Sequence, residues 1–144
     1  SLSGAHGLAL NRRRSTCGPL AGATPAGRSG MPCPGVLTAP AEAAHRAVRD
    51  AVALRLTAMG TPPPAAEPVY ALPFPVTDRA SALRLAGTVE ERCAAVWRSA
   101  LAETTGADRE LALGALIGCA ERATRVRRAA GVTPVTVALP GAPA

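Results

Sequence analysis

The chain has 144 residues and a formal net charge of +6, and 48% of its residues are hydrophobic although only 2% are aromatic. This length fits one domain with a core of ordinary size, and an apolar content made of Ala, Leu and Val favours closely packed helices. No apolar run approaches the ~20 residues of a membrane-spanning helix, so we expect no membrane partner.

The positive charge is concentrated in the first part of the chain. Residues 1–40 carry four Arg and no acidic residue, which gives +4, and the remaining 104 residues contribute only +2. All sixteen basic residues are Arg, which we attribute to codon usage in a GC-rich genome rather than to selection for phosphate binding. A nucleic-acid partner is therefore not expected, and binding through the Arg-rich N-terminal arm stays an alternative.

Residues 1–39 are rich in Gly, Pro, Ser, Thr and Arg and show no sustained period of 2 or 3.6. They are predicted to be disordered or irregular. A first helix is predicted over 40–59, because Pro40 suits the first helical position and Gly60 ends the pattern. Its apolar stripe shares one face with Glu42 and consists of His45, Val48, Val52, Leu56 and Met59.

A Pro-rich crossover is predicted over 60–77. Eighteen residues at ~3.1 Å each span about 55 Å, whereas a twenty-residue helix is only about 30 Å long. The crossover can therefore run back along the whole bundle, so the helices on either side of it should be parallel. Its apolar residues alternate with period 2 and predict a strap with a structural role for both aromatics; they are Tyr70, Leu72, Phe74 and Val76.

The second helix is predicted over 78–104 with Thr77 or Asp78 as its cap, and its apolar face includes Cys93 and Trp97 with Glu90 on one flank. The third helix is predicted over 107–130, ended by Gly131. A short turn between these helices requires an antiparallel hairpin. The arginines late in the third helix are interpreted as a solvated face; they are Arg122, Arg125 and Arg128. The tail after it, with Val135, Val137 and Leu139 alternating, predicts a second extended strap.

Parallel and then antiparallel helices joined by one long crossover are typical of a ferritin-like bundle. Three stretches also resemble an actinobacterial ferritin-like family catalogued as domain of unknown function 4439: the linker and helix start over 70–83, residues 90–98 and residues 134–141. The resemblance covers about residues 41–141 and implies an all-α, four-helix ferritin-like fold in the cytoplasm with no established activity. The first helix of the family is not recognisable here, so residues 40–141 form the predicted domain.

Ferritin-like di-metal proteins take a Glu from each of two helices and a Glu-x-x-His from each of the other two. Glu42 and His45 match one such pair, Glu90 matches a lone Glu, and Glu121 supplies an acid without its His. His45 lies fourteen residues before the predicted end of its helix, Glu90 fourteen before its own, and Glu121 fourteen after the start of the third. All three should lie near one layer, which is the hypothetical metal site.

Structural interpretations of the same residues stay open. Glu42 suits a first helical turn, His45 can be a satisfied edge histidine, and Glu90 can pair with an Arg. We therefore expect a ferritin-like module without catalytic activity and without cofactor. The alternative is a di-iron or di-manganese carboxylate protein acting as an oxidase or in metal storage, because oxygen and imidazole ligands suit iron or manganese.

Four cysteines occur at positions 17, 33, 93 and 119, without C-x-x-C or zinc-site spacing. Cys93 and Cys119 are predicted to lie level across the hairpin as free thiols, as expected in a reducing cytoplasm. The alternative is a disulfide between them, which would contradict a cytoplasmic location or imply a redox role. Three helices arranged for a four-helix core leave an apolar groove lined by the first helix. We expect either that a second copy of the chain covers this groove, giving a homo-oligomer, or that the chain is a monomer of low stability with a mobile first helix.

Overall fold

Three α-helices make up the fold in the computed structural model, which describes residues 34–142. They are α1, Pro34–Ala58; α2, Arg79–Glu103; and α3, Gly106–Ala130. No strand occurs within this range, so the predicted all-α class is confirmed. The expectation of disorder over residues 1–33 lies outside the described residues. None of the three helices is both long and apolar enough to cross a membrane.

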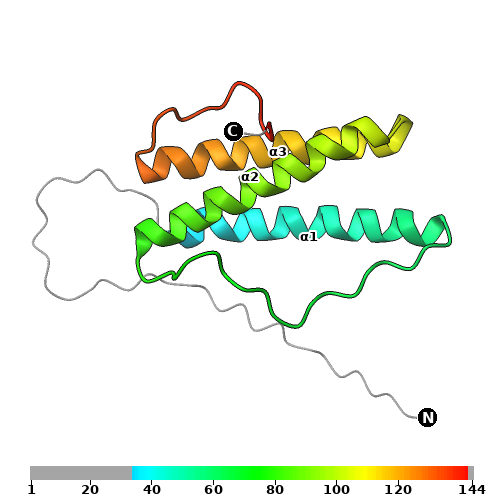
Figure 1. Ribbon diagram of the computed structural model, residues 1–144, viewed down its shortest axis with the longest axis horizontal. Coiled ribbons are helices and arrows are strands. Elements are labelled where there is room, and N and C mark those ends of the chain that lie inside the picture. The colour runs from blue at the N-terminus through cyan, green and yellow to red at the C-terminus, as the bar shows by residue number, and fades with distance from the viewer. Residues whose placement is uncertain (1–33, 143–144) are drawn as a thin grey trace, which may run out of the picture.

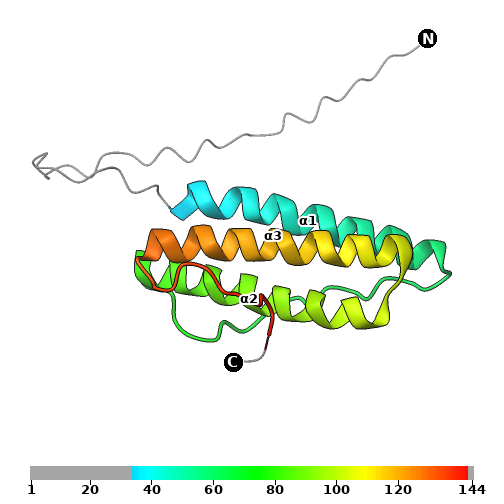
Figure 2. The ribbon, with the colours of Figure 1, turned by 90° about the horizontal axis from the view of Figure 1, so that it is seen from above.

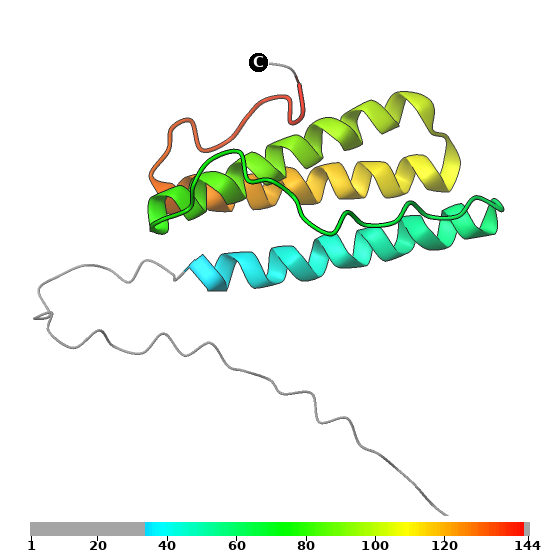
Figure 3. The same cartoon turned by 60° about the horizontal axis from the view of Figure 1, so that its bottom comes forward.

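The helices run in the predicted directions. α1 and α2 point the same way and α3 returns antiparallel to α2 (Figure 1). The crossover leaves the C-terminal end of α1 and runs back to the start of α2 at the opposite end of the bundle (Figure 3). Only Thr104 and Thr105 separate α2 from α3, which enforces the hairpin.

Local signals fix the ends of α2 and α3. Asp78 caps α2: its Oδ1 accepts from the Ser81 N–H at 2.7 Å, and the Ser81 Oγ accepts from the Asp78 N–H at 3.0 Å. This reciprocal pair satisfies donors that the first turn leaves free. Gly131 ends α3 in the left-handed region, with φ of 68°. α3 begins at Gly106 rather than at residue 107.

The predicted start of α1 was wrong. The helix begins at Pro34 and continues through Pro40, so residues 34–39 are helical rather than irregular. Pro34 takes the first position for which Pro40 seemed suited, and Pro40 costs one internal hydrogen bond. Leu37 is half-buried and lines a cavity together with Ala41 and Val126, so packing on α3 favours the additional turns.

The core is narrow and lies mainly between α2 and α3. Its buried residues are Leu83, Ala94, Ala112, Ala115, Cys119, Ala123 and Val126. No described residue of α1 is fully buried, and Met59, predicted on its inner stripe, lies beyond the helix end and is 68% exposed. Arg55 ties α1 to the start of α3 by donating to both oxygens of Asp108 at 2.7 and 3.0 Å. α1 is thus attached along an edge.

The crossover does not form the predicted strap. Tyr70 is 71% exposed and Leu72 is 58% exposed, and neither covers the helices. Phe74 alone makes a ring contact, with the Arg84 guanidinium 3.7 Å from its centroid. A proline-rich chain repeats its side chains about every three residues, so positions two apart do not share one edge.

The C-terminal tail returns along the α2–α3 hairpin (Figure 2). Val135 is half-buried, but Val137 and Leu139 remain exposed, so the apolar edge predicted for this strap is only partly present. The closest approach is made by Gly141, where a Cβ would overlap the backbone carbonyl of Ala94. The absence of a side chain at Gly141 is what lets the tail lie against α2.

We expect Gly141→Ala to release the tail. Gly141, with φ of 74°, and Gly131, with φ of 68°, both have left-handed backbones, which alanine adopts at a cost of about 1–2 kcal/mol. Only at Gly141 would the Cβ of the alanine also clash with a neighbouring backbone. Amide exchange over residues 135–142 should speed up about tenfold or more in Gly141→Ala and much less in Gly131→Ala. Equal exchange in the two variants would mean that backbone strain alone determines tail docking.

Candidate functional site: a buried polar layer

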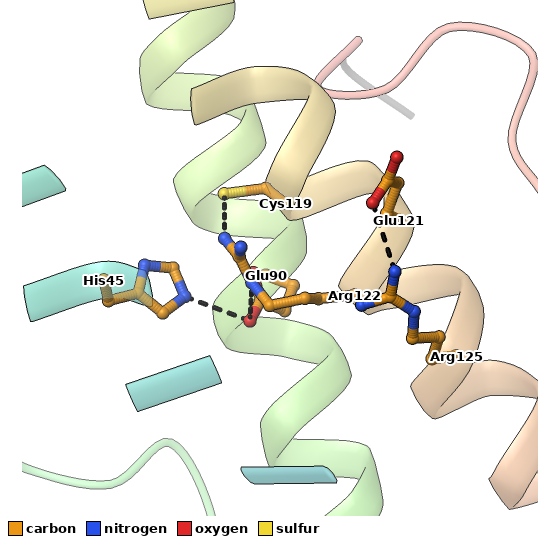
Figure 4. Close-up of polar contacts among 6 residues, drawn as sticks. All are labelled: His45, Glu90, Cys119, Glu121, Arg122 and Arg125. Carbon is orange, nitrogen blue, oxygen red and sulfur yellow. Dashed lines mark hydrogen bonds and ion pairs between the residues drawn. The ribbon is translucent and has the colours of Figure 1, made fainter. Parts of the chain in front are cut away.

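One polar side chain from each helix meets at the middle of the bundle. His45 comes from α1, Glu90 from α2 and Arg122 from α3 (Figure 4). Glu90 continues the buried stripe of α2, which is spaced at three and four residues and comprises Leu83, Gly87, Glu90 and Ala94. Helical periodicity therefore places a carboxylate where an apolar residue would ordinarily lie.

Glu90 is held by two partners at a single oxygen. Its Oε1 accepts a hydrogen bond from Arg122 Nε at 2.9 Å and lies 3.0 Å from His45 Nε2. A hydrogen bond from His45 to an ionised carboxylate requires a proton on Nε2, because such a carboxylate can only accept. The Glu90 side chain is 5% exposed, and its Oε2 is buried without a hydrogen-bond partner among the described residues.

Arg122 balances the buried charge. Its side chain is 15% exposed, and although burial lowers the pKa of its guanidinium, the hydrogen bond and charge of Glu90 hold that pKa above the ordinary value. A second nitrogen, Nη2, donates to Cys119 Sγ at 3.3 Å. The guanidinium thus joins the carboxylate of α2 to the sulfur of α3.

Cys93 and Cys119 are free thiols that line one cavity from α2 and α3. The hydrogen bond from Cys119 lowers the pKa of Cys93 to about 6; burial and the charge of Glu90 oppose this shift, whereas the neighbouring His45 and the charge of Arg122 support it. The same hydrogen bond, together with burial, raises the pKa of Cys119. Cys93 is half-buried whereas Cys119 is 1% exposed, so the two thiols differ in both charge and access.

Alkylation by iodoacetamide should therefore be selective. In a Cys17→Ser/Cys33→Ser background, we expect Cys93 to react at pH 6 about tenfold faster than in the urea-unfolded chain, because its greater thiolate fraction outweighs its lower intrinsic nucleophilicity. As the pH is lowered, the alkylation rate of Cys93 should fall to half of its high-pH value near pH 6, because the lowered pKa keeps the thiolate present down to that pH. Cys119→Ala, which removes the hydrogen-bond donor, should shift the midpoint upward, whereas Cys119→Ser should retain it. A midpoint near 8.5 in the native protein would contradict this assignment.

The structure brings together two of the four predicted metal ligands. Glu42 is 68% exposed in its side chain and pairs with Arg46. Glu121 is 59% exposed and accepts from Arg125 at 3.2 Å, pointing away from the layer (Figure 4). Glu121 follows the buried Cys119 by two residues, which is about 200° around the helix, so it shares the level of Glu90 but not its side.

The structure also places the predicted structural residues. Trp97 is half-buried and lines a cavity of about 330 Å³ between α1 and the hairpin, together with Val48, Cys93 and Cys119. Phe74 lies beneath Arg84, and Tyr70 takes no part in the site. Trp97 is therefore the one aromatic residue beside the polar layer.

The donors in the layer fit a metal poorly. One ligand atom each from His45, Glu90 and Cys119 lies within 4.8 Å of the others, a spacing that a single ion could bridge. Arg122, however, already donates to Glu90 and to Cys119, so its fixed positive charge would repel a cation there. A di-metal centre would also need carboxylates that Glu42 and Glu121 do not bring to the layer.

Arg122 is the residue that sequence reasoning misplaced. It was assigned to a solvated face with Arg125 and Arg128, yet only the last two are exposed. Its position, three residues after Cys119 and four before Val126, puts it on the flank of the buried stripe. A buried Glu90 requires a cationic partner, and the alternative in which Glu90 pairs with an Arg is confirmed.

Comparison with known proteins identifies relatives without an assigned activity. The family model for the domain of unknown function DUF4439 matches residues 35–144. The crystal structure of a conserved hypothetical protein, rv2844, from Mycobacterium tuberculosis is similar, with 39% sequence identity and a TM-score of 0.62. That match covers 65% of this chain and 71% of the other chain. The search of curated proteins gave no match.

Proposed function

Since the chain belongs to the DUF4439 family of domains of unknown function, we propose that it is a ferritin-like helical module in which an arginine has replaced the metal. In this proposal residues 40–141, extended by the first turns of α1, form one cytoplasmic domain without catalytic activity. The parallel pair α1 and α2, the long crossover and the antiparallel α3 support the ferritin-like layout. The free thiols of Cys93 and Cys119 suit a reducing compartment.

The observation that carries the proposal is the contact of Arg122 with Glu90. In ferritin-like metal proteins, carboxylates and imidazoles converge in the bundle core to bind cations. Here the converging carboxylate and thiol both receive hydrogen bonds from the guanidinium. The positive charge that a metal would supply is already present as a covalent part of α3.

Association with a second copy of the chain is the role that we assign to the module. The cavity beside α1 corresponds to the groove expected from three helices in a four-helix layout, and His45 and Val48 line it. On the hairpin, Val96 is 66% exposed and Ile117 is 51% exposed. Apolar side chains exposed on a helical surface favour burial against a partner. The Arg-rich arm that would bind nucleic acid lies outside the described residues.

A cobalt titration of two arginine variants tests the replacement. Arg122→Ala frees His45, Glu90 and Cys119, so we expect it to bind Co²⁺ with a thiolate-to-cobalt absorption band. The wild type and Arg125→Ala, in which an exposed arginine three residues further along α3 is removed, should show no such band. The double variant Arg122→Ala/Cys119→Ala should lose the band again. Equal Co²⁺ binding by the wild type and Arg122→Ala would overturn the proposal and favour a di-iron or di-manganese protein.

A further inference from the structure

Two sulfurs meet at the wall of the cavity between α1 and the hairpin. Cys93 on α2 and Cys119 on α3 line the same cavity, and each thiol shifts the pKa of the other. Both line the cavity of about 330 Å³, but Cys93 is half-buried while Cys119 is almost fully enclosed. A reagent entering the cavity therefore reaches Cys93 first.

Each helix contributes one arginine to the lining of this cavity. Arg49, Arg92 and Arg122 line it together with His45; Arg49 pairs with Asp50, and the charge of Arg122 acts on both thiols. Glu90 is the one carboxylate that acts on them from within the layer. A cationic, partly open setting is the environment in which a cysteine becomes nucleophilic, whereas structural buried cysteines are inert.

We propose that Cys93 and Cys119 form a thiol–disulfide switch, in which Cys93 is oxidised by a hydroperoxide and Cys119 resolves the product to an intramolecular disulfide. This activity is separate from the proposed function, because it requires neither a metal nor self-association. Because both side chains line one cavity from adjacent helices, a disulfide bond of about 2.05 Å can form by a local approach of the two sulfurs.

The reaction balances with hydrogen peroxide as the oxidant. The Cys93 thiolate attacks one peroxide oxygen, an S–O bond forms as the O–O bond breaks, and hydroxide leaves. The Cys119 sulfur then attacks the Cys93 sulfur, the S–O bond breaks, and the departing hydroxide takes the Cys119 proton as water. In total, the Cys93 thiolate, the Cys119 thiol, one peroxide and the proton that Cys93 had released give one disulfide and two waters. A small dithiol reverses the switch by thiol–disulfide exchange.

Arg122 gives the switch a structural consequence. Its Nη2 donates to Cys119 Sγ at 3.3 Å in the reduced protein, beside its bond to Glu90 (Figure 4). Disulfide formation moves that sulfur toward α2 and weakens its capacity to accept. Oxidation of the cysteines should therefore weaken one of the two hydrogen bonds of the Arg122 guanidinium, which also neutralises Glu90.

Peptide mapping tests the proposal on the full chain in a Cys17→Ser/Cys33→Ser background. After equimolar hydrogen peroxide, trypsin should yield residues 93–98 linked to residues 110–122, and dithiothreitol should release the two peptides. In Cys119→Ser, which keeps a hydroxyl at the buried position, dimedone should trap a sulfenic acid on Cys93. In Cys93→Ser, Cys119 should stay unmodified, with the helical circular dichroism unchanged in both variants.

Three results would overturn the switch. The first is oxidation of Cys93 to sulfinic acid without the linked peptide, and the second is a disulfide between two chains on a non-reducing gel. The third is a peroxide reaction at pH 6 that is no faster in the folded protein than in the urea-unfolded chain, where about tenfold faster is expected.

Discussion

Replacing Arg122 with methionine should lower the free energy of unfolding by about 3 kcal/mol. The substitution keeps an unbranched apolar stem but leaves Glu90, with a side chain 5% exposed, without its guanidinium. Breaking a buried ion pair at one partner is costly because the other charge remains buried. His45 stays beside the carboxylate at 3.0 Å, which keeps the loss at the lower end of the usual range. Urea unfolding at pH 7 measures the change.

Two further variants separate charge from packing. Arg125→Met removes an arginine of the same helix whose ion pair with Glu121 is more than half exposed on both sides, and it should cost less than about 0.5 kcal/mol. Glu90→Leu combined with Arg122→Met removes both buried charges and should recover most of the loss. If the double variant is as unstable as Arg122→Met alone, the loss comes from packing rather than from an unpaired carboxylate.

Leu83→Ala should destabilise the protein by about 3 kcal/mol, within the range for large-to-small changes in cores. Leu83 is 3% exposed on α2, and the fully buried core around it consists otherwise of alanines, Cys119 and Val126. The short alanine side chains around this position cannot fill the space that the leucine leaves, so a cavity should remain. Thermal unfolding followed by circular dichroism gives the measurement.

Leu54→Ala is the matched control for Leu83→Ala. Leu54 has the same side chain on α1 but is 73% exposed, so its loss should change stability by less than about 0.5 kcal/mol. A comparable loss from Leu54→Ala would mean that the outer face of α1 is covered in solution, whereas the proposed self-association covers the cavity lined by His45 and Val48. Concentration dependence of the melting temperature would then identify a second copy as the cover.

Helix order and register could be predicted because they depend on local signals. Asp78, Gly131 and the short turn after α2 define the hairpin, and the length of the crossover sets the direction of α1. Counting residues from the predicted helix ends then placed His45 level with Glu90. These inferences need only helix geometry, which depends little on what surrounds the helix.

Side-chain orientation about each helix could not be predicted as well. Glu121 and Arg122 are neighbours in sequence, yet only Arg122 faces the layer, because the core stripe of α3 follows Cys119 and Val126. The start of α1 was missed because the helix continues through Pro40, and the half-buried Leu37 of the additional turns lines a cavity with Val126 of α3. The exposure of Tyr70 depends on the path of an irregular linker, which no periodic pattern specifies.

Metal analysis of the wild-type protein, purified without chelator and loaded with neither iron nor manganese, tests the central claim most directly. The claim is that Arg122 supplies the positive charge that Glu90 requires. It predicts less than about a tenth of an equivalent of iron, manganese or zinc per chain, because the buried carboxylate is already neutralised. One or more equivalents of iron or manganese that are lost in Glu90→Gln would contradict it and establish a metal centre at this layer.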